Sequence, residues 1–234
     1  MNGQFCRTEA LIGAQALQRL QQARVAIFGV GGVGGYVVEA LARSGVGALD
    51  LVDNDTVAPS NLNRQIIALH STLGQYKVDA AKARVLDINP ECRVQVHRMF
   101  YLPETAHLFD FSQYDYVVDA IDTVSGKLAL VEQARTAGVP IICSMGAGNK
   151  LDPAAFEVAD IFQTSVCPLA RVMRTECRKR GIRRLKVVYS KEPPLRTSQA
   201  DENGVRRAVP ASIAFVPAAA GLVLAGEVVR ELTL

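Results

Sequence analysis

Cysteine pairs at the CxxC spacing are absent from this sequence. The five cysteines are odd in number and scattered along 234 residues: Cys6, Cys92, Cys143, Cys167 and Cys177. Disulfide frameworks take an even, regularly spaced set and zinc clips take closely paired thiols, so this pattern argues against both. Scattered thiols are typical of a reducing compartment, and we expect a cytoplasmic protein.

An excess of one charge is also lacking. The chain has 26 Lys and Arg against 23 Asp and Glu, a formal net charge of +3. A field this weak does not commit the whole molecule to nucleic acid or to a membrane surface. Any site for a polyanion must therefore be a local patch.

Long apolar runs are missing as well. The start of the chain, MNGQFCRTEA, has no apolar core of a leader segment, and the most apolar late stretch, residues 213–226, includes Pro217. That stretch is shorter than the roughly 20 residues that a membrane-spanning helix needs. We expect it to be a buried helix of a protein that makes no membrane contact, with one large domain core rather than two.

What the sequence does have is a regular alternation of short apolar runs and helical patterns. We predict strands over residues 25–28, 49–52, 93–98, 116–119 and 140–143, and helices over 10–22, 33–44, 75–88 and 125–137. This alternation predicts an α/β fold: a doubly wound, Rossmann-type, mostly parallel sheet with helices on both faces. Beyond Met145 we expect a glycine-containing loop, a basic helix over 168–180, a strand over 185–190 and a polar, mobile loop over 191–208.

A glycine-rich turn follows the first predicted strand. The segment Gly29-Val30-Gly31-Gly32-Val33-Gly34 opens a helix, and such a turn lets main-chain N–H groups approach a phosphate. A tight turn without any ligand would give the same pattern. Asp53 ends the second strand about 20 residues later, where a carboxylate can accept hydrogen bonds from the ribose of either NAD or ATP.

The residues that favour ATP over NAD as the ligand come next in the sequence: Asn61, Arg64, Lys77 and Asp122. A triphosphate that loses pyrophosphate needs cations on its oxygens and a carboxylate for the metal, whereas NAD has no use for a second cation pair. Alone, Arg64 and Lys77 could be surface cations and Asp122 a helix N-cap. Together and in this order they favour ATP with Mg²⁺.

These motifs resemble one known group of proteins. GxGGVG at 29–34, DxDxVxxSNLNRQ at 53–65, Lys77 and DAID at 119–122 are similar to the ThiF/MoeB/HesA relatives of ubiquitin-activating enzymes, over residues 5–150. The resemblance implies that Gly29, Gly31, Gly32 and Gly34 line the nucleotide, Asp53 binds the ribose, Asn61, Arg64 and Lys77 hold the phosphates, and Asp122 binds Mg²⁺. Arg7 matches an arginine that such homodimers insert into the partner's site, which implies a homodimer.

Three further segments indicate a branch of that superfamily. Residues 144–150, 168–174 and 215–221 resemble the tRNA threonylcarbamoyladenosine dehydratases, and this resemblance covers essentially the whole chain. It implies one adenylating domain, with a nucleotide-binding half at 1–150 and a substrate-binding and dimerisation half at 151–234. The implied reaction is ATP-dependent dehydration of threonylcarbamoyladenosine in tRNA through an acyl adenylate, with a sulfur-transfer type protein as a further candidate partner.

Cys167 is the one cysteine that invites a catalytic interpretation, because it begins a predicted helix, where a thiol pKa can fall. No histidine lies beside it in the sequence. We expect a packing role, because intramolecular ring closure on an adenylate replaces an enzyme thiol with proximity.

A basic stripe supports an RNA partner. Its eight cations lie within sixteen residues and are Arg171, Arg174, Arg178, Lys179, Arg180, Arg183, Arg184 and Lys186. Only Glu176 opposes them within the stripe, so it could neutralise several phosphates of tRNA. The alternative is the solvated face of an amphipathic helix.

Three other functions remain open at this point. A sulfur-carrier adenylating enzyme is disfavoured by the missing CxxC pairs. A nicotinamide-dependent oxidoreductase is disfavoured by Arg64, Lys77 and Asp122. A silent scaffold or RNA-binding module is disfavoured because the glycine turn, Asp53 and the cations are all retained.

Overall fold

A seven-stranded sheet forms the centre of the computed structural model, which describes residues 3–195 and 210–234. In chain order the strands are β1 (Arg24–Phe28), β2 (Ala48–Val52), β3 (Arg93–His97), β4 (Tyr116–Asp119), β5 (Ile141–Ser144), β6 (Phe156–Asp160) and β7 (Lys186–Ser190). Their spatial order is β3-β2-β1-β4-β5-β7-β6, and all neighbours are parallel except β6 and β7. The order reverses between β1 and β4, which places a topological switch point there.

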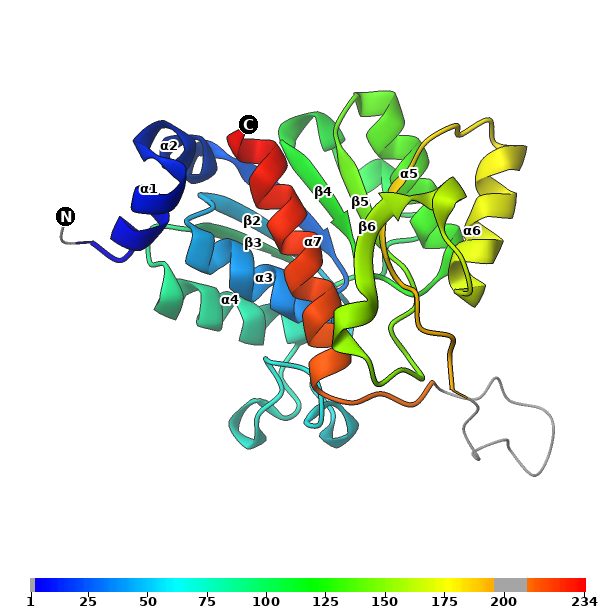
Figure 1. Ribbon diagram of the computed structural model, residues 1–234. Helices are drawn as coiled ribbons and strands as arrows, with labels where there is room; N and C mark the ends of the chain where they lie inside the picture. The colour runs from blue at the N-terminus through cyan, green and yellow to red at the C-terminus, as the bar shows by residue number, and fades with distance from the viewer. Residues whose placement is uncertain (1–2, 196–209) are drawn as a thin grey trace.

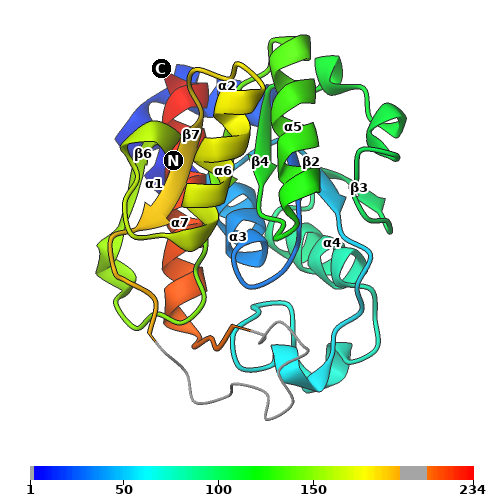
Figure 2. The same cartoon turned by 90° about the vertical axis from the view of Figure 1, so that its right-hand side faces the viewer.

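Helices cover both faces of this sheet (Figures 1 and 2). They are α1 (Cys6–Ile12), α2 (Ala14–Gln22), α3 (Gly34–Ser44), α4 (Lys77–Ile88), α5 (Val124–Ala137), α6 (Pro168–Lys179) and α7 (Phe215–Thr233). Alternate residues of β1 separate the two cores: Val25 and Ile27 pack with α3, α4 and α7, whereas Ala26 and Phe28 pack on the face that α5 covers. Both sets are fully buried, as expected for a central parallel strand.

The C-terminal helix α7 lies across one face of the sheet and packs closely on α3 (Figure 1). A side chain at Gly221 would place its Cβ 2.4 Å from the carbonyl oxygen of Val33. Pro217, in the first turn of α7, lies beside Gly32 of the glycine turn, with 3.3 Å between Pro217 Cβ and a Cβ built at Gly32. The last helix of the chain therefore supports the turn that follows the first strand.

Most predicted elements are confirmed within one or two residues, but two differ and one strand had no predicted counterpart. The single helix predicted over 10–22 is wrong: the chain forms α1 and α2, separated by Gly13 at φ 86° and ψ 158°, a conformation open essentially to glycine alone. The strand β6 was not expected. The C-terminal helix starts at Phe215 and continues to Thr233, well past the predicted end at residue 226.

The predicted polar loop over 191–208 lies largely outside the described residues, with only 191–195 described. All five cysteines are free thiols, and each of them except Cys6 is buried. Among the described helices there is none with the length and apolar character required to cross a bilayer.

Candidate nucleotide-binding site

A cavity of about 320 Å³ opens at the switch point, where the carboxyl ends of β1, β2 and β4 meet. Parallel strands bring their ends to one edge, so residues distant in sequence converge there. Of the residues expected from the sequence, the lining includes Gly29, Gly31, Gly32, Asp53, Asn61, Arg64, Lys77 and Asp122. This convergence required the fold, because Gly29 and Asp122 are 93 positions apart.

Close backbone approaches shape the glycine turn. Gly29 has φ 90°, and a Cβ there would lie 2.7 Å from the carbonyl oxygen of Ala120, at the end of β4. Gly34 does not line the cavity but begins α3, where a Cβ would lie 1.8 Å from the carbonyl oxygen of Gly29. The glycines thus let β1, α3 and the end of β4 meet without side chains in between.

Asp53 ties the glycine turn to the end of β2. Its Oδ2 accepts a hydrogen bond from the Val30 N–H at 2.8 Å, and its Oδ1 accepts one from the Asp55 N–H at 2.9 Å. A carboxylate has about four acceptor positions, so lone pairs remain for hydroxyl donors in the cavity. The position fits an acceptor of ribose hydroxyls whose orientation is already set.

The two cations are held differently. Lys77 begins α4 with its side chain 8% exposed, and its Nζ lies 2.6 Å from Asp55 Oδ2 and 4.0 Å from Asp53 Oδ1. Arg64 donates from Nη1 to the Ser60 carbonyl at 2.9 Å and to Asn63 Oδ1 at 3.0 Å. A polyphosphate entering the cavity would compete with Asp55 for Lys77.

Asn61 has a local structural partner. Its Oδ1 accepts a hydrogen bond from the Ala58 N–H at 3.0 Å, which closes the short 3₁₀ turn Pro59–Asn61. Its amide nitrogen remains the group available to a phosphate. Asn61 is 9% exposed, so this amide is held in one place at the cavity wall.

Asp122 reaches the cavity from the turn after β4, and its side chain is exposed. No group of three or more His, Cys, Asp or Glu residues that could hold a metal occurs within residues 3–195 and 210–234. Mg²⁺ in nucleotide sites is commonly held by one or two carboxylates together with phosphate oxygens. The donor set therefore fits a Mg²⁺ ion that arrives with a nucleotide, with Asp122 as its carboxylate.

Several features of this cavity were not predicted from the sequence. Met99, Phe100 and Tyr101 line it after β3, and Gln65 lines it beside Gly31. Behind the wall lies a fully buried ion pair, Asp119 with Lys127. Complete burial raises the pKa of Asp119, and the Lys127 ammonium opposes that rise. The signal for this pair was an aspartate that ends an apolar strand followed by a lysine in a helix.

Arg7 lies outside this cavity. It is an exposed residue of α1, and α1 leads through α2 to the amino end of β1 (Figure 1). The cavity lies at the carboxyl end of that strand. Within one chain, the described structure therefore does not bring Arg7 to the other predicted site residues.

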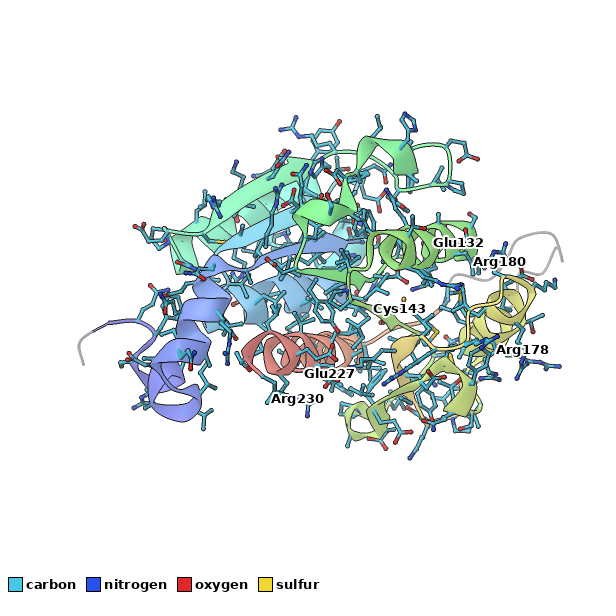
Figure 3. The ribbon with its side chains drawn as sticks, turned by 90° about the horizontal axis from the view of Figure 1, so that it is seen from above. Glu132, Cys143, Arg178, Arg180, Glu227 and Arg230 are labelled. Atoms are coloured by element: carbon cyan, nitrogen blue, oxygen red, sulfur yellow. The ribbon has the colours of Figure 1, made fainter. Side chains whose placement is uncertain are left out.

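Several cations of the basic stripe already contact other groups of the protein. Arg174 donates to the Thr164 carbonyl at 2.9 Å, and Arg178 lies 5.3 Å from the ring centroid of Phe162. Arg180 pairs with Glu132 of α5 at 3.2 Å as well as with Glu176. Figure 3 shows the side chains of Arg180 and Glu132 directed toward one another. Glu176 is the one acid within the stripe, but acids distant in sequence also pair with its cations, as Glu227 and Glu231 do with Lys186.

Cys167 is 2% exposed and stands at the N-cap position of α6. Its Sγ lies 3.6 Å from a Cβ built at Gly146, so the thiol fills space against the loop after β5. This placement supports the packing role expected for it.

Known proteins that are similar to this chain provide independent evidence about its family. A family model described as "ThiF family" matches residues 5–233. A Bacillus subtilis protein named tRNA threonylcarbamoyladenosine dehydratase is 47% identical, over 98% of this chain and 94% of its own length. The crystal structure of Escherichia coli TcdA, a tRNA N6-threonylcarbamoyladenosine dehydratase, in complex with ATP superimposes with a TM-score of 0.89 at 33% identity, over 98% of this chain and 93% of that chain.

A relative from another branch matches less of the chain. The probable adenylyltransferase/sulfurtransferase MoeZ of Mycobacterium tuberculosis is 35% identical over 56% of this chain and 33% of its own length.

Proposed function

Because this chain belongs to the ThiF family, we propose that it is an ATP-dependent dehydratase that cyclises threonylcarbamoyladenosine in tRNA. The observation that carries the proposal is the single cavity that joins Asp53, Arg64, Lys77 and Asp122 at the switch point. The similarity to the named dehydratases, including one solved with ATP, supports the same activity.

The chemistry needs an activated carboxyl group. The substrate carboxylate attacks the α-phosphate of ATP, pyrophosphate leaves, and an acyl adenylate forms. A nucleophile in the same modified base then attacks the acyl carbon, and AMP leaves with one oxygen of the original carboxylate. The nucleoside has then lost the elements of one water, and proximity takes the place of an enzyme thiol.

The residues of the cavity divide this work. Asp53 orients the ribose, Asn61 donates to the phosphates, and Arg64 and Lys77 neutralise charge that develops as pyrophosphate leaves. Mg²⁺, held by Asp122 and phosphate oxygens, would supply further charge stabilisation when bound. The cytoplasm supplies ATP and tRNA, and a homodimer would let Arg7 of one subunit reach the site of the other.

A direct assay tests the proposal. The protein is incubated with ATP, Mg²⁺ and tRNA that carries threonylcarbamoyladenosine, and the tRNA is digested to nucleosides for mass spectrometry. We expect loss of one water from the modified nucleoside and one AMP formed per event, with neither change when ATP is omitted.

Three other results would each contradict the proposal. Pyrophosphate exchange that depends on a Gly-Gly-ended carrier protein would indicate sulfur-carrier activation. A protein that binds NADH but does not bind ATP would be an oxidoreductase. Absence of any ATP consumption with this tRNA would indicate a binding module.

A further inference from the structure

The fully buried pair of Asp119 and Lys127 lies directly behind the cavity wall. Both side chains are 0% exposed, and Lys127 Nζ lies 3.0 Å from each carboxylate oxygen of Asp119. The same ammonium donates to the Ser144 carbonyl at 2.7 Å. Lys127 therefore connects helix α5 to the ends of two neighbouring strands, β4 and β5.

Asp119 passes this restraint on to the turn that carries Asp122. Its Oδ1 accepts a hydrogen bond from the Ile121 N–H at 3.2 Å, inside the segment from 119 to 122. Ala120 of the same segment donates its N–H to the Phe28 carbonyl at 2.8 Å. Its own carbonyl oxygen lies so close to Gly29 that a Cβ there would be 2.7 Å from it. Because Lys127 holds both carboxylate oxygens, these hydrogen bonds link the turn to helix α5 and to the glycine loop.

Stability alone is a poor explanation for such a pair. Removing two charges from water costs several kcal/mol per ion, and well-packed apolar residues of similar volume often stabilise a protein as well or better. The core between α5 and α6 supplies apolar neighbours such as Leu128, which follows Lys127 in the helix, and Cys143, whose thiol hydrogen-bonds Asp119. What apolar side chains cannot supply is a fixed direction for the Asp119 carboxylate and hence for the Ile121 N–H.

We propose that Lys127 is a positioning residue that acts through Asp119 to hold the 119–122 turn, so that the Asp122 carboxylate faces the phosphate-binding side of the cavity. This inference rests on the proposed role of Asp122. Partners that orient a metal-binding carboxylate typically change metal affinity or activity by about 10- to 100-fold when they are removed.

The test uses a neutral pair that keeps the volume. Asp119→Asn combined with Lys127→Met leaves no buried charge, and Lys127→Arg retains the charge. The matched control is Asp50→Asn, which removes a buried carboxylate from the Arg24 and His97 network in β2, within the strand rather than at its cavity end. Each protein is first checked for folding by thermal melting and circular dichroism.

Two measurements need no turnover. Mg²⁺ is titrated into the protein–ATP complex by calorimetry, and amide hydrogen exchange is followed at Ile121. In the neutral pair we expect Mg²⁺ affinity to fall by about 10- to 100-fold, with Mg²⁺-free ATP affinity within about twofold and Ile121 exchange faster. Lys127→Arg should recover part of the Mg²⁺ affinity, and Asp50→Asn should leave both readouts at wild-type values.

The outcomes are distinguishable. A folded neutral pair with wild-type Mg²⁺ affinity and wild-type Ile121 exchange would overturn the positioning role. If instead Asp122→Ala itself leaves Mg²⁺ affinity unchanged, the metal role of Asp122 in the proposed function is wrong, and the positioning inference falls with it.

Discussion

Asp53 and Asp122 line the same cavity, but we expect them to contribute at different stages. Asp53 holds the glycine turn through the Val30 N–H, and its proposed contact with the ribose would be the same in the ground state and the transition state. Asp53→Ala should therefore weaken ATP binding about 10- to 100-fold, measured by calorimetry, with a smaller loss of kcat. An unchanged ATP affinity would remove Asp53 from the site.

Asp122→Ala should show the reverse pattern. In the proposed role, its contribution through Mg²⁺ would grow as charge develops on the phosphates, so kcat should fall by at least about 100-fold while nucleotide affinity changes much less. Single-turnover AMP formation and equilibrium ATP binding measure the two effects separately. Equal losses in both would show that Asp122 contributes uniform binding instead.

Cys167 tests whether the mechanism is free of thiol chemistry. The side chain is 2% exposed and fits against the loop at Gly146, so Cys167→Ser changes little in volume. We expect the variant to keep most of its turnover, because ring closure on the adenylate requires no covalent enzyme intermediate. Complete inactivity of a folded Cys167→Ser protein would contradict this mechanism.

At the scale of elements, the contact between α7 and α3 depends on a glycine. A Cβ at Gly221 would lie 2.4 Å from the Val33 carbonyl oxygen and 2.8 Å from Tyr36 Cβ, so the helices must move apart. We expect Gly221→Ala to lower the free energy of unfolding by about 1–3 kcal/mol, as overpacking does. Because Val33 belongs to the glycine turn, ATP affinity should fall as well.

Gly226 provides the control within the same helix. A Cβ there meets nothing within 4 Å, so Gly226→Ala should raise the free energy of unfolding by up to about 1 kcal/mol through helix propensity. Urea denaturation of both variants measures the difference. If both substitutions stabilise the protein, the close approach of α7 to α3 is not a constraint.

The basic stripe around α6 is the element expected to contact tRNA, and its exposed cations carry the test. Arg171, Arg183 and Arg184 are exposed. Arg178 and Arg180 are also exposed but contact Phe162 and Glu132, and the half-buried Arg174 contacts Thr164. Replacing Arg171, Arg183 and Arg184 with Gln should weaken tRNA binding and reduce the salt slope by about 0.7–0.9 per lost phosphate contact. Filter binding across a salt series measures this change.

Two controls accompany this prediction. The triple variant should keep its ATP affinity. Arg230 lies on α7, away from the stripe (Figure 3), and Arg230→Gln should leave tRNA binding unchanged. An unchanged salt slope in the triple variant would make the stripe a solvated surface. The polar segment with Arg196, Arg206 and Arg207, which lies outside the described residues, would then become the stronger candidate.

At the scale of the whole molecule, the question is whether two chains build one site. Arg7 lies at the far end of β1 from its own cavity, so a catalytic role requires a second subunit. We expect inactive Arg7→Ala and inactive Asp122→Ala proteins to recover about a quarter of wild-type turnover when mixed at random, because half of the dimers then contain one intact site. Absence of recovery, with subunit exchange verified by tagged chains, would place Arg7 outside catalysis.

Local patterns were enough to predict much of this protein. The strand ends, the glycine turn and the residues that follow β2 and β4 are short-range features. The spacing of apolar residues and the glycines that interrupt it reflect the backbone conformation of a few neighbouring residues. Asp53 and Asp122 each follow a predicted strand, and the cavity at the shared carboxyl edge of these strands contains both. Arg64 and Lys77 entered by motif and spacing, and the cavity contains both.

Tertiary structure alone decided the features that depend on distant partners. The strand β6, with the sequence FEVAD, is a strand because it pairs with β7, nearly thirty residues later, in hydrogen bonds that no local pattern encodes. The cations of the stripe find Glu132 and Glu227 on other helices. Lys127 occupies an ordinary helical position in the sequence, and only the packing of α5 between the ends of β4 and β5 makes it a buried partner of Asp119, since burial is a property of the assembled layers rather than of neighbouring residues.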